Sequence, residues 1–181
     1  MNNLILEASR YAERWHRGIF RKYTGEPYIF HPARVAARVS FLPQTDNFLV
    51  AAAWLHDVVE DCGVSKASIC GIFGSRIAEI VWELTNPSKK YPEKPRYERK
   101  AMDLDHIAKI SVEAKLIKIC DRIDNLNDYP VWDEEAAKFV RDKYYNESVD
   151  LYDVVKDADY WLGCELAQTL ENVRRKFSIG E

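Results

Sequence analysis

The sequence has few of the features that mark several common protein classes. Its four cysteines are scattered and form no Cys-x-x-Cys pair, which argues against a zinc ribbon or a dithiol redox motif. We interpret them as reduced thiols of the core. The longest apolar stretch, near residues 49–55, is far too short to span a bilayer, and no basic start precedes an apolar run. We therefore expect a soluble, cytoplasmic protein without a membrane partner.

An excess of charge of one sign is also missing. The net charge is -3, which provides no global field for attracting a nucleic acid. A polyanionic ligand must then be drawn by a local cluster of Lys and Arg. We expect no DNA or RNA partner, and the composition carries no sign of an oligomeric state.

Sustained period-two alternation is hard to find, whereas apolar residues recur at helical spacing almost everywhere. We predict an all-α fold of about eight or nine helices. With no repeat or linker-like composition, residues 1–181 are expected to form one compact domain. The segments Gly18 to Phe30 and Asn86 to Arg96 break the pattern and are candidate functional loops. Helix starts are expected at Pro32, Asp46, Ser65, Ser75, Ser111 and Asp133.

The stretch from Ala51 to Asp61, AAAWLHDVVED, places four ionisable residues in an otherwise apolar helix. His56 and Glu60 are four residues apart, as are Asp57 and Asp61, so all four share one broad helical face. Burying carboxylates among apolar residues is costly unless a cation or hydrogen bonds offset it. A metal would provide that offset. The alternative is an exposed acidic stripe on an amphipathic helix.

A second polar face is expected on the helix that follows Ser111, where apolar residues at three- and four-residue intervals define a core stripe. Acidic and amide side chains align on another side of this helix, and neighbouring basic residues could balance them as a solvated face. The aligned residues are Asp121, Asp124, Asn125 and Asp128, and the basic ones are Lys118 and Arg122.

The third piece is His31, which stands in YIFHP just before a proline. By itself it would be interpreted as structural. Together with His56, Asp57 and Asp121 it makes a mixed set of nitrogen and oxygen ligands. Such a set suits an octahedral Mn²⁺ or Fe²⁺ site and is less typical of a thiolate-rich zinc site. The remaining coordination positions would hold water and substrate.

Taken in order, His31, His56-Asp57 and Asp121 resemble the H…HD…D pattern of the HD-domain metal-dependent phosphohydrolases, a superfamily with an all-helical fold. HRGIFRKYTGEPYIFHPARVA resembles the signature of Rel/SpoT-type alarmone hydrolase domains, and LHDVVED, FGSRIAEIVWELT and KICDRIDNLND continue the likeness. The resemblance runs from His16 to Asp128. It implies a single HD-domain helical bundle, and the length is similar to that of the small alarmone hydrolases, which lack a synthetase region.

The resemblance implies hydrolysis of guanosine tetra- or pentaphosphate to pyrophosphate and GDP or GTP, usually with Mn²⁺. It assigns His31, His56, Asp57 and Asp121 as metal ligands. Glu60 and Asp61 match the acidic pair that positions and deprotonates the attacking water, and Glu60 is our first choice as the base. General-base assistance of this kind is typically worth about 10²- to 10⁴-fold.

Arg21 and Lys22 match the basic pair that the family places beside the nucleotide, where a guanidinium stacks on the base or pairs with phosphate. Asn125 matches a ribose-contacting asparagine. Considered without the resemblance, Arg21 and Lys22 would be a solvated loop pair. The second loop carries a basic cluster that is either a rim over the pocket or a charged surface, namely Lys89, Lys90, Lys94, Arg96 and Lys100. Aromatic residues at helical spacing are interpreted as core rather than pocket, namely Trp132, Tyr144, Tyr145, Tyr152 and Trp161.

Asp124 departs from the family pattern, because many members carry His or Tyr at this position. An acid beside Asn125 is expected to change how a phosphorylated ribose is held. The substrate alternatives are therefore another nucleotide, such as the 2′-phosphate of NADPH or a nucleoside monophosphate. A noncatalytic ligand-binding HD module is the alternative from a different class, although the six ligand and acid positions are all occupied as the pattern requires.

Overall fold

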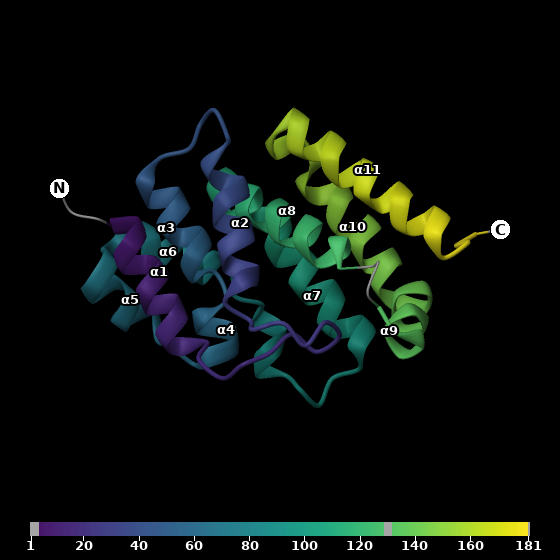
Figure 1. The fold of residues 1–181 in the computed structure, drawn as a ribbon, viewed down its shortest axis with the longest axis horizontal. Coiled ribbons are helices and arrows are strands. Elements are labelled where there is room, and N and C mark those ends of the chain that lie inside the picture. Colours follow the sequence, from purple (N-terminus) through teal and green to yellow (C-terminus); the bar gives the residue numbers. More distant parts are fainter. Residues whose placement is uncertain (1–3, 129–131, 181) are drawn as a thin grey trace.

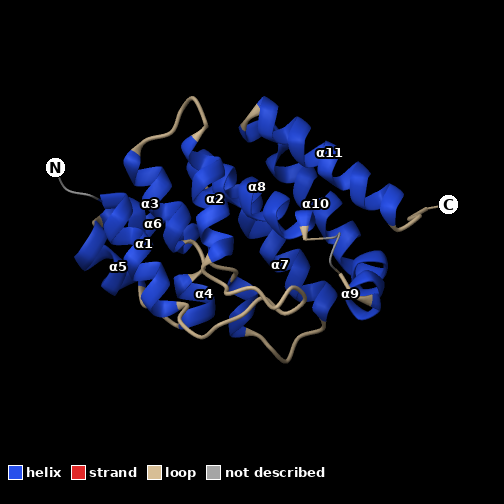
Figure 2. Cartoon of the chain, viewed as in Figure 1, coloured by secondary structure: helices blue, strands red, loops and turns tan. Residues whose placement is uncertain are grey.

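The computed structural model describes residues 4–128 and 132–180, and this part of the chain is helical with no β-strand (Figures 1 and 2). The predicted all-α fold is confirmed. Shorter 3₁₀ segments are η1 (Pro87–Lys90) and η4 (Lys156–Ala158), and η3 (Val140–Tyr144) is a π-helix. The α-helices are α1 (Leu4–Trp15), α2 (Phe30–Ser40), α3 (Asn47–Leu55), α4 (Val58–Cys62), α5 (Lys66–Phe73), α6 (Ser75–Leu84), α7 (Arg96–Lys109), α8 (Val112–Asn127), α9 (Glu134–Phe139), α10 (Tyr145–Val155) and α11 (Tyr160–Lys176).

Two pairs of these helices are nearly continuous. Helix α9 passes through η3 directly into α10, and α3 is separated from α4 by two residues. When each pair is counted as one, the eleven α-helical segments of the described residues become nine, which agrees with the expected eight or nine. None of the helices in residues 4–128 and 132–180 combines the length and apolar character needed to cross a membrane.

The helix starts follow from local hydrogen bonding. Four predicted caps accept a hydrogen bond from the backbone amide three residues further on, at 2.8 to 3.2 Å, which satisfies an otherwise unpaired donor of the first turn. Ser75 is different, because it is the first residue of α6 and Gly74 precedes it as the cap. The four confirmed caps are Asp46, Ser65, Ser111 and Asp133.

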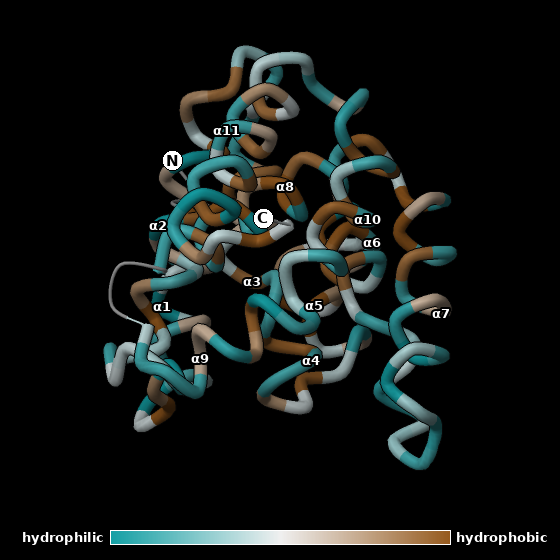
Figure 3. The backbone as a smooth tube through the Cα atoms, turned by 90° about the vertical axis from the view of Figure 1, so that its right-hand side faces the viewer, coloured by the Kyte–Doolittle hydropathy of each residue, from teal (hydrophilic) through white to brown (hydrophobic). Residues whose placement is uncertain are grey.

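Helix α8 runs through the centre of the bundle and contacts α2, α6, α10 and α11 (Figure 1). Its apolar stripe is buried from Leu116 to Leu126, as Ile119 and Ile123 show with no exposed surface, but Val112 at its start is 58% exposed. Hydrophobic stretches lie around α8 in the interior, and the loop that precedes α7 is hydrophilic (Figure 3). The cysteine interpretation was wrong for two positions: Cys120 is buried, but Cys70 and Cys164 are exposed, because both point away from this core.

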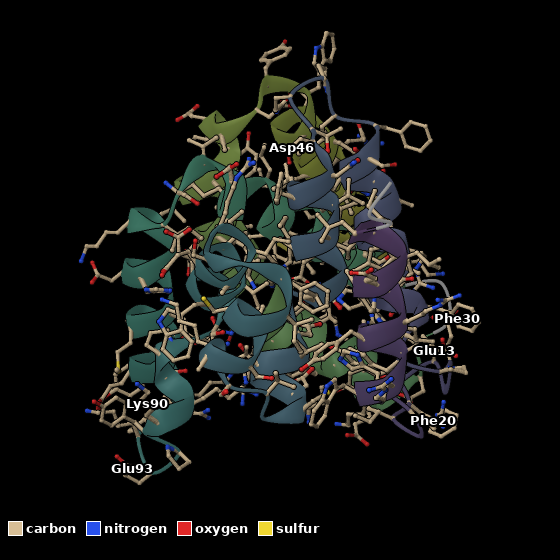
Figure 4. All side chains as sticks on the ribbon, turned by 90° about the vertical axis from the view of Figure 1, so that its left-hand side faces the viewer. Glu13, Phe20, Phe30, Asp46, Lys90 and Glu93 are labelled. Atoms are coloured by element: carbon tan, nitrogen blue, oxygen red, sulfur yellow. The ribbon has the colours of Figure 1, made fainter. Side chains whose placement is uncertain are left out.

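The two predicted loops lie at the same end of the bundle. Phe20 of the first loop and Lys90 of the second are labelled on opposite sides of this end (Figure 4). In the first loop an isolated bridge joins Phe20 to Pro27, and the positive φ of Gly25 (69°) allows the tight turn between them. The second loop contains η1. Helix α4 connects both, because Asp57 before it contacts the first loop and Glu60 within it contacts the second.

Candidate metal centre and the adjoining cavity

Three helical elements bring the predicted ligands to one point. His31 is the second residue of α2, and Asp121 lies in the middle of α8. His56 and Asp57 occupy the two-residue break between α3 and α4, which lets consecutive side chains turn toward the same place. Elements far apart in sequence therefore contribute all four side chains.

The four side chains are in mutual contact. The Nε2 atoms of His31 and His56 are 3.3 Å apart, and His31 Nε2 is 3.3 Å from Asp121 Oδ1. Asp57 Oδ2 lies 3.0 Å from His56 Nε2 and 3.5 Å from His31 Nε2. His31, His56 and Asp121 are buried and offer ligand atoms that all lie within 4.8 Å of one another. The cluster is compact enough to surround a single ion.

The outer ring nitrogens fix which way each histidine faces. His56 Nδ1 is 2.8 Å from the carbonyl oxygen of Ala53, and His31 Nδ1 is 2.7 Å from Asp124 Oδ2. A carbonyl or carboxylate oxygen accepts a hydrogen bond, so each Nδ1 carries the proton. When the rings are neutral, as metal ligation requires, each Nε2 lone pair points into the cluster.

The electrostatics of the cluster favour a positive charge at its centre. Burial lowers the pKa of His31, but hydrogen bonds to Asp121, Asp124 and Asp57 outweigh it and raise the pKa well above its usual value. Burial likewise opposes ionisation of Asp57, yet His56 and His31 hold its pKa well below the usual range. The carboxylates are therefore ionised, and they stabilise a proton or a metal cation between the imidazoles.

The donor set fits a divalent ion. Two nitrogens bound to one ion at right angles, each at about 2.1 Å, would lie about 3 Å apart, close to the spacing of the two Nε2 atoms. Two imidazoles and two carboxylates make a nitrogen and oxygen set without thiolate, which suits octahedral first-row metals. The structure thus contains a possible His/Asp metal site.

The acidic pair on α4 lies beside this cluster. Glu60 accepts hydrogen bonds from the backbone amide of Asn86 at 3.0 Å and from its side-chain amide at 3.2 Å. Lys89 Nζ is 3.3 Å from Glu60 Oε1 and 3.8 Å from Asp61 Oδ1. Burial and the charge of Asp57 raise the pKa of Asp61. Glu60 is thus held rigidly by the second loop, whereas Asp61 is coupled to the ligand Asp57.

A cavity of about 260 Å³ adjoins the cluster. Two hydrogen bonds connect its wall to the ligands, because the Tyr28 hydroxyl donates to Asp57 at 2.8 Å and the Asn125 amide donates to Asp121. All three predicted substrate-binding residues lie in the wall. The lining residues are Arg21, Lys22, Tyr23, Tyr28, Asn125, Asp128, Trp132, Phe139, Val140 and Tyr144.

The two basic residues of this wall differ in how firmly they are held. Arg21 is largely buried and pairs with Asp128, which raises its pKa despite the opposing effect of burial. Its guanidinium also lies 5.9 Å from the ring centre of Tyr28. Lys22 is mostly exposed and its Nζ lies 3.2 Å from Glu135. Arg21 is therefore a fixed cation at the cavity, and Lys22 is a mobile side chain at its edge.

The basic cluster of the second loop does not gather at the cavity. Most of its members meet an acidic side chain within hydrogen-bonding or ion-pair distance, and Lys90 lies 5.9 Å from the ring centre of Trp82. The pairs are Lys89 with Glu60 and Asp61, Lys94 with Glu98, Arg96 with Glu147, and Lys100 with Asp103.

Sequence reasoning missed several residues of the site. Tyr28 joins the cavity to Asp57, and its position in YIFHP beside His31 was the available signal. Asn86 holds Glu60, and its only signal was its place in the second loop. Trp132 and Tyr144 pack against the core as expected and also line the cavity, whereas Trp161, interpreted as core, is 75% exposed.

The sequence model of the HD domain family matches residues 8–156. The chain belongs to the HD domain family. In this HD domain the His56-Asp57 pair is placed at a helix break, which explains how two adjacent residues both reach the cluster.

Several relatives of this HD domain are named as guanosine-3′,5′-bis(diphosphate) 3′-pyrophosphohydrolases. The guanosine-3′,5′-bis(diphosphate) 3′-pyrophosphohydrolase MESH1 of Drosophila melanogaster is 37% identical over 148 residues, which is 78% of both chains. The Xenopus tropicalis protein of the same name is 38% identical over 127 residues, 69% of each chain. The chain spans about a fifth of the length of longer bacterial relatives, such as the guanosine-3′,5′-bis(diphosphate) 3′-pyrophosphohydrolase of Aquifex aeolicus, to which it is 33% identical over 149 residues.

A solved structure extends the similarity to the whole fold. It is described as a metazoan ortholog of SpoT that hydrolyses ppGpp and plays a role in starvation responses. It covers 99% of this HD domain and 98% of its own chain, with a TM-score of 0.80 and 30% sequence identity. The arrangement of helices is therefore shared from end to end.

Proposed function

We propose that this HD domain is a metal-dependent phosphohydrolase that removes the 3′-diphosphate of guanosine 3′,5′-bis(diphosphate), releasing pyrophosphate and GDP. The observation that carries the proposal is the direct link between the cluster and the cavity. Asn125 contacts Asp121 and Tyr28 contacts Asp57, so a nucleotide in the cavity would lie one side chain away from the ligand cluster. The activity printed for the Drosophila relative supports the choice of substrate.

The metal is proposed to be Mn²⁺, held by His31, His56, Asp57 and Asp121. Such an ion, when bound, polarises a phosphate ester and acidifies water, which makes hydrolysis feasible near neutral pH. The protein contributes the placement of the four side chains. Their outer hydrogen bonds, described above for both histidines, hold the ligand atoms in the orientation that binding requires.

The acidic pair on α4 is proposed to handle the attacking water. The two amide donors of Asn86 hold the Glu60 carboxylate in one orientation, and an oriented carboxylate is what a general base needs. Asp61 is the residue after Glu60 and lies beside Asp57, and we propose that it positions the same water. Lys89 reaches both carboxylates from the second loop and limits their movement.

The substrate is proposed to enter the cavity with its phosphates toward the cluster. Arg21 and Lys22 are the basic side chains of the wall, and a substrate phosphate would replace or share their carboxylate partners, Asp128 and Glu135. Tyr28, Trp132 and Tyr144 offer aromatic surfaces for a base or ribose. The partner is thus a small phosphorylated nucleotide.

The test is Mn²⁺-dependent turnover of guanosine 3′,5′-bis(diphosphate), NADPH and nucleoside monophosphates by the purified protein, with pyrophosphate and orthophosphate measured separately. We expect pyrophosphate from the alarmone, and the double variant Glu60→Ala/Asp61→Ala serves as the inactive control. Orthophosphate from another nucleotide would keep the chemistry but discard the substrate. No turnover of any of them would indicate a binding module.

A further inference from the structure

Asp124 lies behind the metal cluster rather than in the cavity. It follows Asp121 by one turn of α8, is 6% exposed, and accepts a hydrogen bond from His31 Nδ1 at 2.7 Å. The sequence predicted an effect on the ribose through Asn125. The structure instead directs the carboxylate to the outer face of His31, because residues three apart on a helix project along the same side.

A single arginine holds the other side of this carboxylate. Arg34 lies one turn after His31 on α2, and its Nε is 2.7 Å from Asp124 Oδ1 while its Nη2 is 3.2 Å from Oδ2. This two-pronged contact fixes the plane of the carboxylate. Glu26 of the first loop binds the same guanidinium at 2.8 and 3.0 Å. The chain of contacts therefore runs from Glu26 through Arg34 and Asp124 to His31.

This arrangement accounts for a buried carboxylate that would otherwise be costly. The hydrogen bond to His31 and the fork of Arg34 compensate the lost hydration of Asp124. The fixed carboxylate in turn prevents rotation of the imidazole and makes its Nε2 a stronger donor, since hydrogen bonding at Nδ1 raises the basicity of the other nitrogen.

We infer that Asp124 and Arg34 are positioning residues that hold His31 in its ligating orientation and set the affinity of the metal centre. Neither residue lines the cavity that we assign to the substrate. Both line a second groove of about 780 Å³, between α2 and α11, which borders the cavity at Asp128. The inference rests on the proposed metal centre, and it assigns control of metal binding to residues that do not contact the substrate.

The test is titration of the purified, metal-free protein with Mn²⁺ alone, followed calorimetrically. Asp124→Asn should weaken Mn²⁺ binding by about 10- to 100-fold, the usual cost of losing a partner of a metal-bound histidine. Arg34→Met should weaken it less, and Arg34→Lys, which keeps the charge without the fork, should fall between Arg34→Met and the wild type.

A matched control is present on the same helix. Arg38 lies one turn beyond Arg34, lines the same groove and pairs with Glu165 rather than Asp124. Arg38→Met should therefore leave Mn²⁺ affinity unchanged. Equal weakening by Arg34→Met and Arg38→Met would overturn the inference, because it would indicate a general disturbance of α2.

Kinetics separate positioning from a merely structural role. At saturating Mn²⁺, Asp124→Asn and Arg34→Met should recover most of the wild-type kcat with the KM for nucleotide unchanged. A low kcat that excess Mn²⁺ does not restore would count against the inference. Should Asp124→Asn fail to fold, Arg34→Met and Arg34→Lys carry the same comparison, with thermal unfolding recorded for each.

The failure of this inference differs from the failure of the metal centre itself. His31→Ala should abolish high-affinity Mn²⁺ binding. If the wild type bound no Mn²⁺, or if His31→Ala bound it as tightly as the wild type, the proposed metal centre would be wrong. If His31→Ala lost the ion while Asp124→Asn kept the wild-type affinity, the metal centre would stand and the positioning pair would not.

Discussion

The ligand cluster and the basic segment of residues 89–100 are both rich in charge, yet they are arranged in opposite ways. In the basic segment, Lys94 pairs with Glu98 at 3.2 Å and Lys100 with Asp103 at 3.6 Å, so these cations meet acids of their own surroundings. In the cluster, two imidazole nitrogens face each other at 3.3 Å among ionised carboxylates. The first arrangement is complete, whereas the second has a place for a cation.

This difference shows which kind of charge pattern indicates a site. Charge density alone does not, because the basic segment is the denser of the two in the sequence. What distinguishes the cluster is that two buried imidazole nitrogens face each other inside it, an arrangement that a bound ion would complete, although Lys118 already pairs with Asp121 at 3.0 Å. Mutations that remove a ligand should therefore have large effects, and mutations within a complete pair should have small ones.

The largest effect is expected for His56→Ala. Loss of one of the two imidazoles should abolish high-affinity Mn²⁺ binding and lower kcat/KM by about 10³-fold, since a bound metal supplies several kcal/mol of transition-state stabilisation. The bound Mn²⁺ of the purified variant and its turnover rate test the two effects. His106→Ala is the control, because His106 on α7 binds the Glu83 carbonyl at 2.7 Å away from the cluster. Unchanged metal content in His56→Ala would refute the proposed difference between the ligand cluster and the basic segment.

The acidic pair should come next. Glu60→Gln should lower kcat by about 10²-fold or more while Mn²⁺ affinity stays near the wild type, because the residue acts on water rather than on the ion. Asp61→Asn is the matched variant on the neighbouring residue. Steady-state kinetics at saturating Mn²⁺ compare them, and a larger loss in Asp61→Asn would transfer the role of base to Asp61.

A smaller effect is expected at the cavity wall. Arg21→Met should raise the KM for guanosine 3′,5′-bis(diphosphate) about tenfold, which corresponds to about 1.4 kcal/mol of lost binding, with kcat nearly unchanged. Asp128→Asn controls for the broken ion pair with Arg21. A fall in kcat at constant KM would instead place Arg21 at the reacting phosphate.

The smallest effect is expected within the basic segment. Lys94→Gln removes an exposed ion pair with Glu98 on the first turn of α7, and such pairs contribute less than about 0.5 kcal/mol. Thermal unfolding and turnover should both match the wild type. A tenfold rise in KM would show that this segment contacts the substrate after all and that its internal pairs open on binding.

The helices of the fold could be predicted from helical periodicity and from capping residues. The caps at Asp46, Ser65, Ser111 and Asp133 are local signals, because each is satisfied by a backbone amide three residues away. The break at His56 and Asp57 was not predictable in this way. The sequence places both residues on one continuous helical face, whereas the structure ends α3 at Leu55 and restarts the helix at Val58.

The four ligand residues and the three cavity residues were named from the sequence because they match residues of a family pattern; the HD domain match confirms the family, and the roles of these residues stay predictions. Tyr28, Asn86 and the outer contact of Asp124 escaped prediction for a physical reason. Asn86 reaches Glu60 across 26 residues of sequence, and Asp124 reaches His31 across 93. Contacts between residues so far apart in sequence cannot be inferred from the periodicity of a single helix.

By itself, the sequence determined that this chain is helical, where several helices begin, and which residue types can bind a divalent ion, because these properties arise from neighbours within one or two turns. The tertiary structure decided which carboxylate serves which partner. Asp121 turns toward the imidazole nitrogens, whereas Asp124, one turn later, meets the outer nitrogen of His31 and the fork of Arg34. Two aspartates with the same chemistry take different roles because they meet opposite nitrogens of His31 on α2, and the contact of α2 with α8 exists only in the folded chain.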